Sequence, residues 1–222
     1  MEIRNNLTNV NFNFRDTIPR WIVIHNTANG TSKEGTAYNN TVYFKDTYRA
    51  ASAHYFVDDG DIVWRCVRDT DTAWAVGEAQ SRNGCYNTNS VSIEVCETAG
   101  GWFTDKEVAT LSALVQGLMK LYGIPAERVC RHHDVTGKNC PWYYSDDTKW
   151  AELKKRILEG DMLTKEDANA IWAFDNWGDQ EGALKGTAWK NLIDTNKRIQ
   201  EVEKGVASLA KKVDAIAKKL GA

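Results

Sequence analysis

Residues 21–28 read Trp-Ile-Val-Ile-His-Asn-Thr-Ala, and residues 132–141 read His-His-Asp-Val-Thr-Gly-Lys-Asn-Cys-Pro. The first stretch is a short apolar run, which predicts a buried strand ending at His25. The second places a histidine eight residues before Cys140. A lone histidine at a strand end is usually structural, but two imidazoles and one thiolate can form a zinc site whose fourth position stays open for water. The two stretches together predict a mononuclear zinc hydrolase.

The composition is that of an ordinary globular protein: 42% of the 222 residues are hydrophobic and 26% are charged. This excludes wholesale disorder, a collagen-like chain and a membrane bundle. The net charge of −2 gives no basic field, so we expect neither nucleic acid nor a membrane as partner. The polar start of the chain predicts no signal peptide, and hence synthesis in the cytoplasm. An odd count of five cysteines without paired spacing argues against a disulfide framework. Four of them have no metal partner at useful spacing and are expected to be small buried hydrophobes: Cys66, Cys85, Cys96 and Cys130.

Residues 1–160 have the pattern of one α/β unit. Strands are expected at 53–58 and 62–67, on either side of an Asp-Asp-Gly-Asp turn, and at 91–96. Thr104 followed by Glu107 predicts a capping box, after which apolar residues recur at helical spacing as far as Tyr122. A last amphipathic helix is expected at 150–158.

Residues 161–222 form a different pattern, with a small helical linker or wall-binding module expected at 161–190. From residue 191 a heptad repeat predicts a coiled-coil helix, and hence a homo-oligomer through 191–222. The alternative is a helix packed back on its own catalytic domain. The predicted core positions of the repeat are Leu192, Thr195, Ile199, Val202, Val206, Leu209, Val213, Ile216 and Leu220.

Five segments in one order carry a resemblance: 21–28, 52–58 (Ser-Ala-His-Tyr-Phe-Val-Asp), 72–77 (Thr-Ala-Trp-Ala-Val-Gly), 90–96 (Ser-Val-Ser-Ile-Glu-Val-Cys) and 132–141. Over about residues 1–158 the chain resembles the zinc-dependent N-acetylmuramoyl-L-alanine amidases of phage endolysins. These are relatives of T7 lysozyme and the peptidoglycan recognition proteins. The resemblance implies an α/β fold with a mixed central β-sheet flanked by helices. The small helical region and the coiled coil, expected from the pattern of residues 161–222, follow it and lie outside the resemblance.

The resemblance also implies roles for individual residues. His25, His132 and Cys140 correspond to the ligands of one Zn²⁺ ion per catalytic domain. Glu94 corresponds to the general base and Lys138 to a residue that stabilises the oxyanion. Some relatives place a tyrosine beside the zinc on the second strand, which residues 52–55 do not clearly supply.

Several of these residues have other interpretations. Glu94 between two apolar neighbours could be a solvent-facing position of an alternating strand, and Lys138 a solvated loop charge. Asp134 could cap a turn or orient a ligand histidine. The remaining three candidates could contact substrate or pack structurally: His54, Trp74 and His133.

The implied function is that of a phage-type endolysin acting at the bacterial cell wall. It would hydrolyse the amide bond between N-acetylmuramic acid and L-alanine in peptidoglycan. One alternative is a non-catalytic peptidoglycan-binding protein, but such relatives have lost the cysteine ligand. Another is a cytosolic muropeptide-recycling amidase, but those relatives typically carry Asp where Cys140 stands and lack a coiled-coil tail. A third assigns the main role to the tail as an assembly scaffold.

Overall fold

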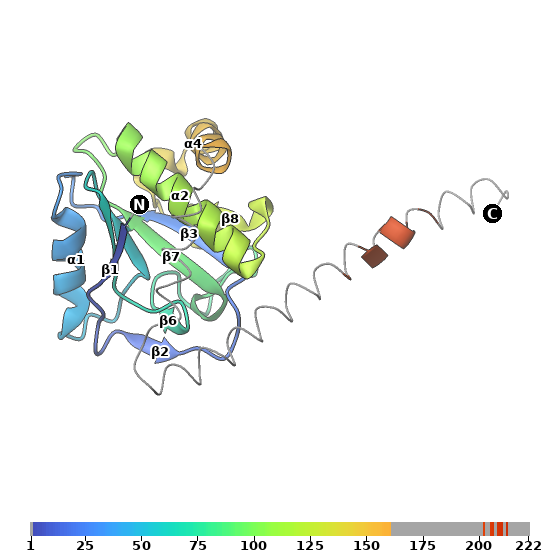
Figure 1. Ribbon diagram of the computed structural model, residues 1–222, viewed down its shortest axis with the longest axis horizontal. Coiled ribbons are helices and arrows are strands. Elements are labelled where there is room, and N and C mark those ends of the chain that lie inside the picture. Colours follow the sequence, from blue (N-terminus) through green and yellow to red (C-terminus); the bar gives the residue numbers. More distant parts are fainter. Residues whose placement is uncertain (1, 161–201, 203–204, 207, 211, 213–222) are drawn as a thin grey trace.

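The computed structural model describes residues 2–160, together with 202, 205, 206, 208–210 and 212 (Figure 1). The module expected at 161–190 and most of the heptad repeat lie outside the described residues. The strands are β1 (Glu2–Asn5), β2 (Phe12–Phe14), β3 (Trp21–Asn26), β4 (Tyr55–Val57), β5 (Ile62–Arg65), β6 (Asp71–Ala73), β7 (Ser90–Val95) and β8 (Val129–Arg131). The helices are α1 (Thr36–Lys45), α2 (Asp105–Tyr122), α3 (His132–Thr136) and α4 (Asp147–Glu159), with 3-10 turns η1 (Asn87–Asn89), η2 (Ala126–Arg128) and η3 (Trp142–Ser145).

Six of the strands form one mixed sheet in the order β1-β5-β4-β7-β3-β8. The four strands β4, β7, β3 and β8 are parallel, whereas β5 runs antiparallel to β4 and carries β1 parallel to itself. Strands β2 and β6 pair separately as a small antiparallel sheet. The expected mixed sheet flanked by helices is therefore confirmed.

The main core lies between one face of the six-stranded sheet and helix α2. Because side chains alternate along a strand, Ile22 and Ile24 of β3 point to this face, and Ile93 of β7 joins them. Helix α2 covers the face with a buried stripe that includes Leu111 and Leu114, and α4 packs beside it (Figure 1). This packing fixes the strands whose carboxyl ends carry the candidate site.

The bounds of α2 follow from its terminal residues. Thr104 accepts a hydrogen bond from the Glu107 backbone N–H, and Glu107 accepts one from the Thr104 backbone N–H, so the predicted capping box is confirmed. At the other end Gly123 adopts φ 65°, a left-handed conformation in which its N–H donates to the Met119 carbonyl. Both ends match the sequence pattern.

The opposite face of the sheet is covered by α1 and α3. Phe56 of β4 packs there in a buried cluster with Ala37 of α1, and Val23 of β3 packs with Val135 of α3. Since residues in register on neighbouring parallel strands point to the same side, His25, Glu94 and Phe56 share this face. The sheet thus directs one histidine and one carboxylate to the same side.

The predicted hairpin at 53–67 is confirmed as β4 and β5, the strand at 91–96 as β7 and the last helix as α4. Strands β1, β2, β6 and β8 and helices α1 and α3 had not been expected. All five cysteines are free and buried, which agrees with the small core residues expected at four of these positions, all but Cys140. Among the described residues, no helix combines the length and the apolar character that crossing a membrane requires.

Candidate metal centre

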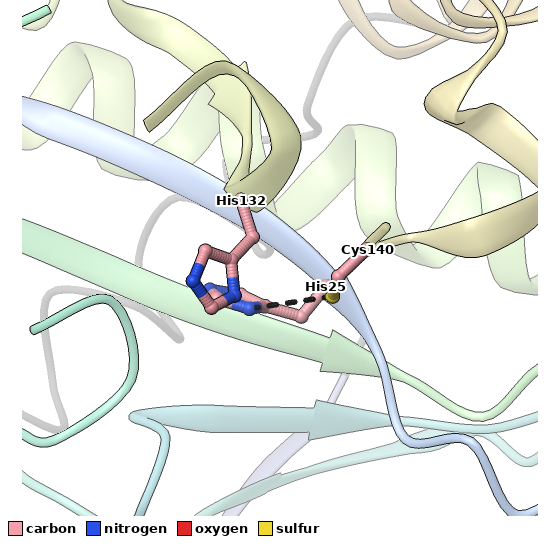
Figure 2. A group of neighbouring side chains, drawn as sticks. All are labelled: His25, His132 and Cys140. Atoms are coloured by element: carbon pink, nitrogen blue, oxygen red, sulfur yellow. Dashed lines mark hydrogen bonds between the residues drawn. The ribbon is translucent and has the colours of Figure 1, made fainter. Parts of the chain in front are cut away.

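Three ligand-type side chains meet at the carboxyl ends of the parallel strands. His25 is the fifth residue of β3, His132 is the first residue of α3 directly after β8, and Cys140 lies in the loop before η3. One ligand atom from each lies within 4.8 Å of the others. Figure 2 shows both imidazole rings and the sulfur turned toward one another, with Cys140 Sγ 3.8 Å from His25 Nδ1. Carboxyl ends of parallel strands are a common place for binding sites.

The cluster has the properties of a metal site. The three residues are 2%, 6% and 5% exposed, and two ring nitrogens, His25 Nε2 and His132 Nδ1, are buried without a hydrogen-bond partner in the described chain. Such atoms cost free energy unless something binds them. Two imidazoles and a thiol are a donor set that zinc prefers. The residues present therefore fit the metal that the sequence predicts.

Burial sets the protonation of the three groups. It lowers the pKa of His25 well below 6.5, with further lowering from His132 and the Lys138 ammonium. It also lowers the pKa of His132 to about 4, so both imidazoles are neutral near pH 7 and can offer a lone pair. Burial raises the pKa of the Cys140 thiol to about 12.

The neighbour His133 is directed elsewhere. Its ring Nδ1 lies 3.2 Å from the carbonyl oxygen of Lys138, and its side chain is only partly buried. Its backbone N–H donates to the Cys140 carbonyl at 2.8 Å. The structure thus brings His132 into the cluster and leaves the His133 ring outside it.

Asp134 caps the turn rather than contacting a ligand histidine in the described hydrogen bonds. Its carboxylate accepts from the backbone N–H of Arg131 at 2.8 Å and from the Arg131 guanidinium at 2.6 Å. The same guanidinium donates to the Tyr144 carbonyl at 2.8 Å and to the Asp147 carboxylate at 2.8 Å. Arg131 therefore ties the start of α3 to the segment that follows Cys140.

Glu94 lies beside the cluster because β7 and β3 pair with Glu94 opposite His25. Its Oε2 is buried and has no hydrogen-bond partner in the described part of the chain. Burial raises the pKa of Glu94 to about 8, while the Lys138 ammonium acts to lower it and the Glu97 carboxylate to raise it. Lys138 itself is exposed, but it is close enough to affect the pKa of Glu94, His25 and His132.

His54 and Trp74 are placed differently. His54 is 1% exposed; its Nδ1 accepts from the Ser92 backbone N–H at 3.0 Å, and its Nε2 lies 3.2 Å from the Asp71 carbonyl. These contacts give His54 a structural place inside the fold, away from solvent. Trp74 is partly buried, and its ring packs edge-on against Tyr48 at 5.8 Å.

Tyr55, the tyrosine of residues 52–55, lies on the face of the sheet opposite to His25. Phe56 is in register with Glu94 and shares its face of the sheet, whereas Tyr55 is in register with Ile93 and points into the α2 core.

Residues 15–143 match the family described as N-acetylmuramoyl-L-alanine amidase (Amidase_2). The chain belongs to this amidase family. Among curated amidases, CwlH of Bacillus subtilis (strain 168) is 33% identical over 148 residues, which is 67% of this chain and 56% of CwlH. CwlL of Bacillus licheniformis is 32% identical over 150 residues, or 61% of this chain and 40% of CwlL. The chain thus spans about half the length of the curated relatives it matches.

Solved structures of amidase relatives share the fold. The catalytic domain of XlyA matches with a TM-score of 0.59 at 30% identity, covering 71% of this chain and 99% of that domain. PlyL matches with a TM-score of 0.61 at 27% identity, covering 73% of this chain and all of PlyL. Both likenesses support the fold described above.

Sequence reasoning missed Asn26 and Glu97, which help to hold this candidate site together. The Asn26 carboxamide oxygen accepts the Trp142 backbone N–H at 3.2 Å, which ties the residue after His25 to the Cys140 loop. Glu97 accepts from the backbone N–H groups of Ala28 and Gly30 and from the Thr27 hydroxyl, and so shapes the loop after β3. Their only sequence signal is proximity to His25 and to the β7 strand.

Proposed function

We propose that this chain is a zinc-dependent N-acetylmuramoyl-L-alanine amidase of the endolysin type. It hydrolyses the amide bond between N-acetylmuramic acid and L-alanine in peptidoglycan and acts at the bacterial cell wall. The observation that carries the proposal is the buried cluster of His25, His132 and Cys140 with a carboxylate, Glu94, beside it. Family membership and the likeness to XlyA and PlyL support it.

The two histidines and Cys140 hold the metal in this proposal. Zinc, when bound, supplies a Lewis acid that polarises the substrate carbonyl and lowers the pKa of water. His25 and His132 meet the requirement for neutral imidazole, because burial keeps both unprotonated near pH 7. Their placement at the ends of β3 and β8 gives them a rigid support.

Glu94 moves the proton in this mechanism. It acts as the ionised carboxylate, a form that the Lys138 ammonium favours and that a bound cation would favour further against the effect of burial. The carboxylate takes a proton from the attacking water and later gives it to the departing L-alanine amine. The unpaired Oε2 leaves one oxygen available for that task. Its position opposite His25 on the neighbouring strand keeps it on the metal side of the sheet.

Lys138 supplies positive charge at the edge of the site. Its ammonium acts on the pKa of Glu94, His25 and Cys140, so it is close enough to act on negative charge that develops there. It therefore stabilises the oxyanion of the tetrahedral species. Its carbonyl accepts the Cys140 N–H at 2.8 Å, which fixes the backbone of this residue.

The test compares the wild type with Glu94→Gln on purified Gram-positive cell walls, with bound zinc measured on every sample. Released N-terminal amines and reducing sugar ends are counted separately. Glu127→Gln, the same change at an exposed residue of η2, is the matched control. We expect the wild type and the control to release amines without reducing ends. Glu94→Gln should lose about 10²–10⁴-fold in rate while it keeps its zinc.

Other outcomes would reject the proposal in distinct ways. Walls that sediment with zinc-loaded wild type but release no amines would indicate a binding protein. Amines released from soluble muropeptides but not from walls would indicate a recycling amidase. Unchanged activity in Glu94→Gln would remove the assigned role of this carboxylate.

We also propose that residues 191–222 pair with a second copy of the chain. Val202, Val206 and Leu209 are helical and 64%, 59% and 61% exposed, and they occupy consecutive core positions of the heptad. Sedimentation equilibrium on Val206→Asp tests this, with Ser208→Asp, outside the heptad core, as control. Val206→Asp should shift the mass toward the monomer and Ser208→Asp should not; a monomeric wild type would reject the pairing.

A further inference from the structure

Two exposed tryptophans lie next to the metal centre and have no role in the mechanism above. Trp102, in the loop after β7, is 49% exposed, and Trp142, the first residue of η3, is 42% exposed. We refer to these two side chains as the indole platform. Large exposed apolar groups that gather at one place mark interaction sites.

Below the indole platform, a series of aromatic rings in contact extends from Tyr143 through Tyr144 to Phe103 in the core. The ring of Tyr143 lies 6.2 Å from each indole and is turned edge-on to both, with interplanar angles of 65° and 82°. Tyr143 in turn packs edge-on against Tyr144 at 5.0 Å, and Tyr144 contacts Phe103 at 4.8 Å. The exposed rings are therefore supported from below.

Two adjacent glycines allow the indoles to lie close to the backbone. A Cβ atom at Gly100 would stand 1.7 Å from Cζ3 of Trp102, and one at Gly101 would stand 2.1 Å from Cζ2 of Trp142. No side chain could be added at either glycine unless an indole moved. The Gly100–Gly101 pair thus fits both rings at once.

Backbone hydrogen bonds fix the indole platform relative to the metal centre. The Trp102 carbonyl accepts from the backbone N–H of Thr98 at 3.0 Å and from its hydroxyl at 2.9 Å. Trp142 follows Cys140 by two residues, and its N–H donates to Asn26, the neighbour of His25. Both rings are held before any ligand arrives, which reduces the entropy lost on binding.

We propose that the indole platform binds the uncharged sugar rings of the glycan strand. This deepens the proposed function, on which it rests. The scissile amide joins a neutral glycan to a stem peptide that carries carboxylates. Flat aromatic faces suit the apolar C–H faces of pyranose rings. The Lys138 ammonium acts on the pKa of Glu94 beside the metal centre, where it suits the peptide's carboxylates.

Three variants test the indole platform. Trp102→Ala and Trp142→Ala remove one ring each. Gly100→Ala keeps both rings but displaces the Trp102 indole, and Gly100 is not among the glycines with positive φ, so its backbone tolerates alanine. Phe14→Ala, at an aromatic residue that is 81% exposed on the separate small sheet, is the matched control. Thermal unfolding of each zinc-loaded protein verifies folding.

Binding is measured by calorimetry with two probes, N-acetylchitotetraose and a free stem tetrapeptide. We expect the wild type and Phe14→Ala to bind the sugar. The three platform variants should weaken sugar binding by about tenfold or more and leave peptide binding within twofold. Trp142→Phe keeps an aromatic face and should recover part of the loss. It replaces Trp142→Ala in the comparison if that variant is poorly folded.

The inference is overturned if the wild type does not bind the sugar, if the platform variants bind it normally, or if they lose the peptide instead. These measurements need no turnover, so they are independent of the amidase assay. Amine release from walls by a wild type that fails to bind the sugar would reject the indole platform and keep the proposed function. Sugar binding at the indole platform without amine release would reject the proposed function and keep the indole platform.

Discussion

At the residue scale, the histidine doublet shows what spacing in a sequence can and cannot specify. Counting eight residues back from Cys140 selected His132, and the structure brings that ring into the cluster. The choice follows from β8 ending at Arg131, so that the first helical residue, His132, turns toward β3. No spacing indicated Asn26 or Arg131, because their partners, Trp142 and Asp147, begin η3 and α4, whose positions depend on the whole fold.

The two adjacent histidines provide a matched pair of variants that test metal binding. We expect His132→Ala to lose zinc, because it removes one of three ligand-type side chains, and His133→Ala to retain it. Metal content after dialysis, measured by atomic emission, checks this. Equal zinc in the two variants would show that the cluster is not the metal site.

Asn87 gives a second prediction at this scale. Its side-chain oxygen accepts the backbone N–H groups of Ala75, Val76 and Gly77 at 2.9, 2.7 and 3.1 Å. Asn87→Ala leaves these donors without that acceptor and should lower the free energy of unfolding by about 1–3 kcal/mol. Asn87→Asp keeps the acceptor and should lose less. Urea unfolding measures both, and equal losses would contradict the assignment.

At the element scale, the sequence predicted elements with a clear period and missed those without one. Helix α2 has its capping box, its apolar stripe and its glycine end. Helix α1 reads Thr-Ala-Tyr-Asn-Asn-Thr-Val-Tyr-Phe-Lys and buries only Ala37 and Thr41, so it shows no apolar stripe. Strand β1 buries Ile3 alone of its four residues, which is too weak a pattern for prediction.

The capping box of α2 should make stability depend on pH. Burial raises the pKa of Glu107 from 4.5 to about 8, against the Thr104 backbone N–H, which acts to lower it. Between these values the folded state keeps a proton that the unfolded state releases. The contribution of Glu107 to the free energy of unfolding therefore falls as the pH rises from about 4.5 to 8.

Glu107→Gln tests that dependence because glutamine does not titrate. Relative to the wild type, the variant should gain stability steadily from pH 5 to pH 8, since only the wild type must ionise a buried carboxyl. Chemical unfolding at several pH values measures the difference. A difference that stays constant with pH, or that moves the other way, would contradict the assignment.

At the scale of the whole molecule, residues 2–160 form one unit. Gln116 of α2 donates to the carbonyl oxygens of Ile157 and Gly160, so the end of α4 is bound to the main core. A protein truncated after Gly160 should keep the zinc content and the melting temperature of the catalytic unit. It should also lose self-association through 191–222. Calorimetry and sedimentation check both, and a melting temperature lowered by more than a few degrees would show that the tail supports the core.

The sheet order also bears on how this protein is best handled. Strand β1 runs antiparallel to β3, so its first residue, Glu2, lies at the same end of the strands as His25. The two strands are four positions apart in the sheet. At about 4.8 Å per strand, that is roughly 20 Å. A flexible dozen-residue polyhistidine tag at the amino terminus spans a similar distance. Such a tag can compete for zinc with the cluster, so a carboxyl-terminal or cleaved tag is the sound choice for counting metal.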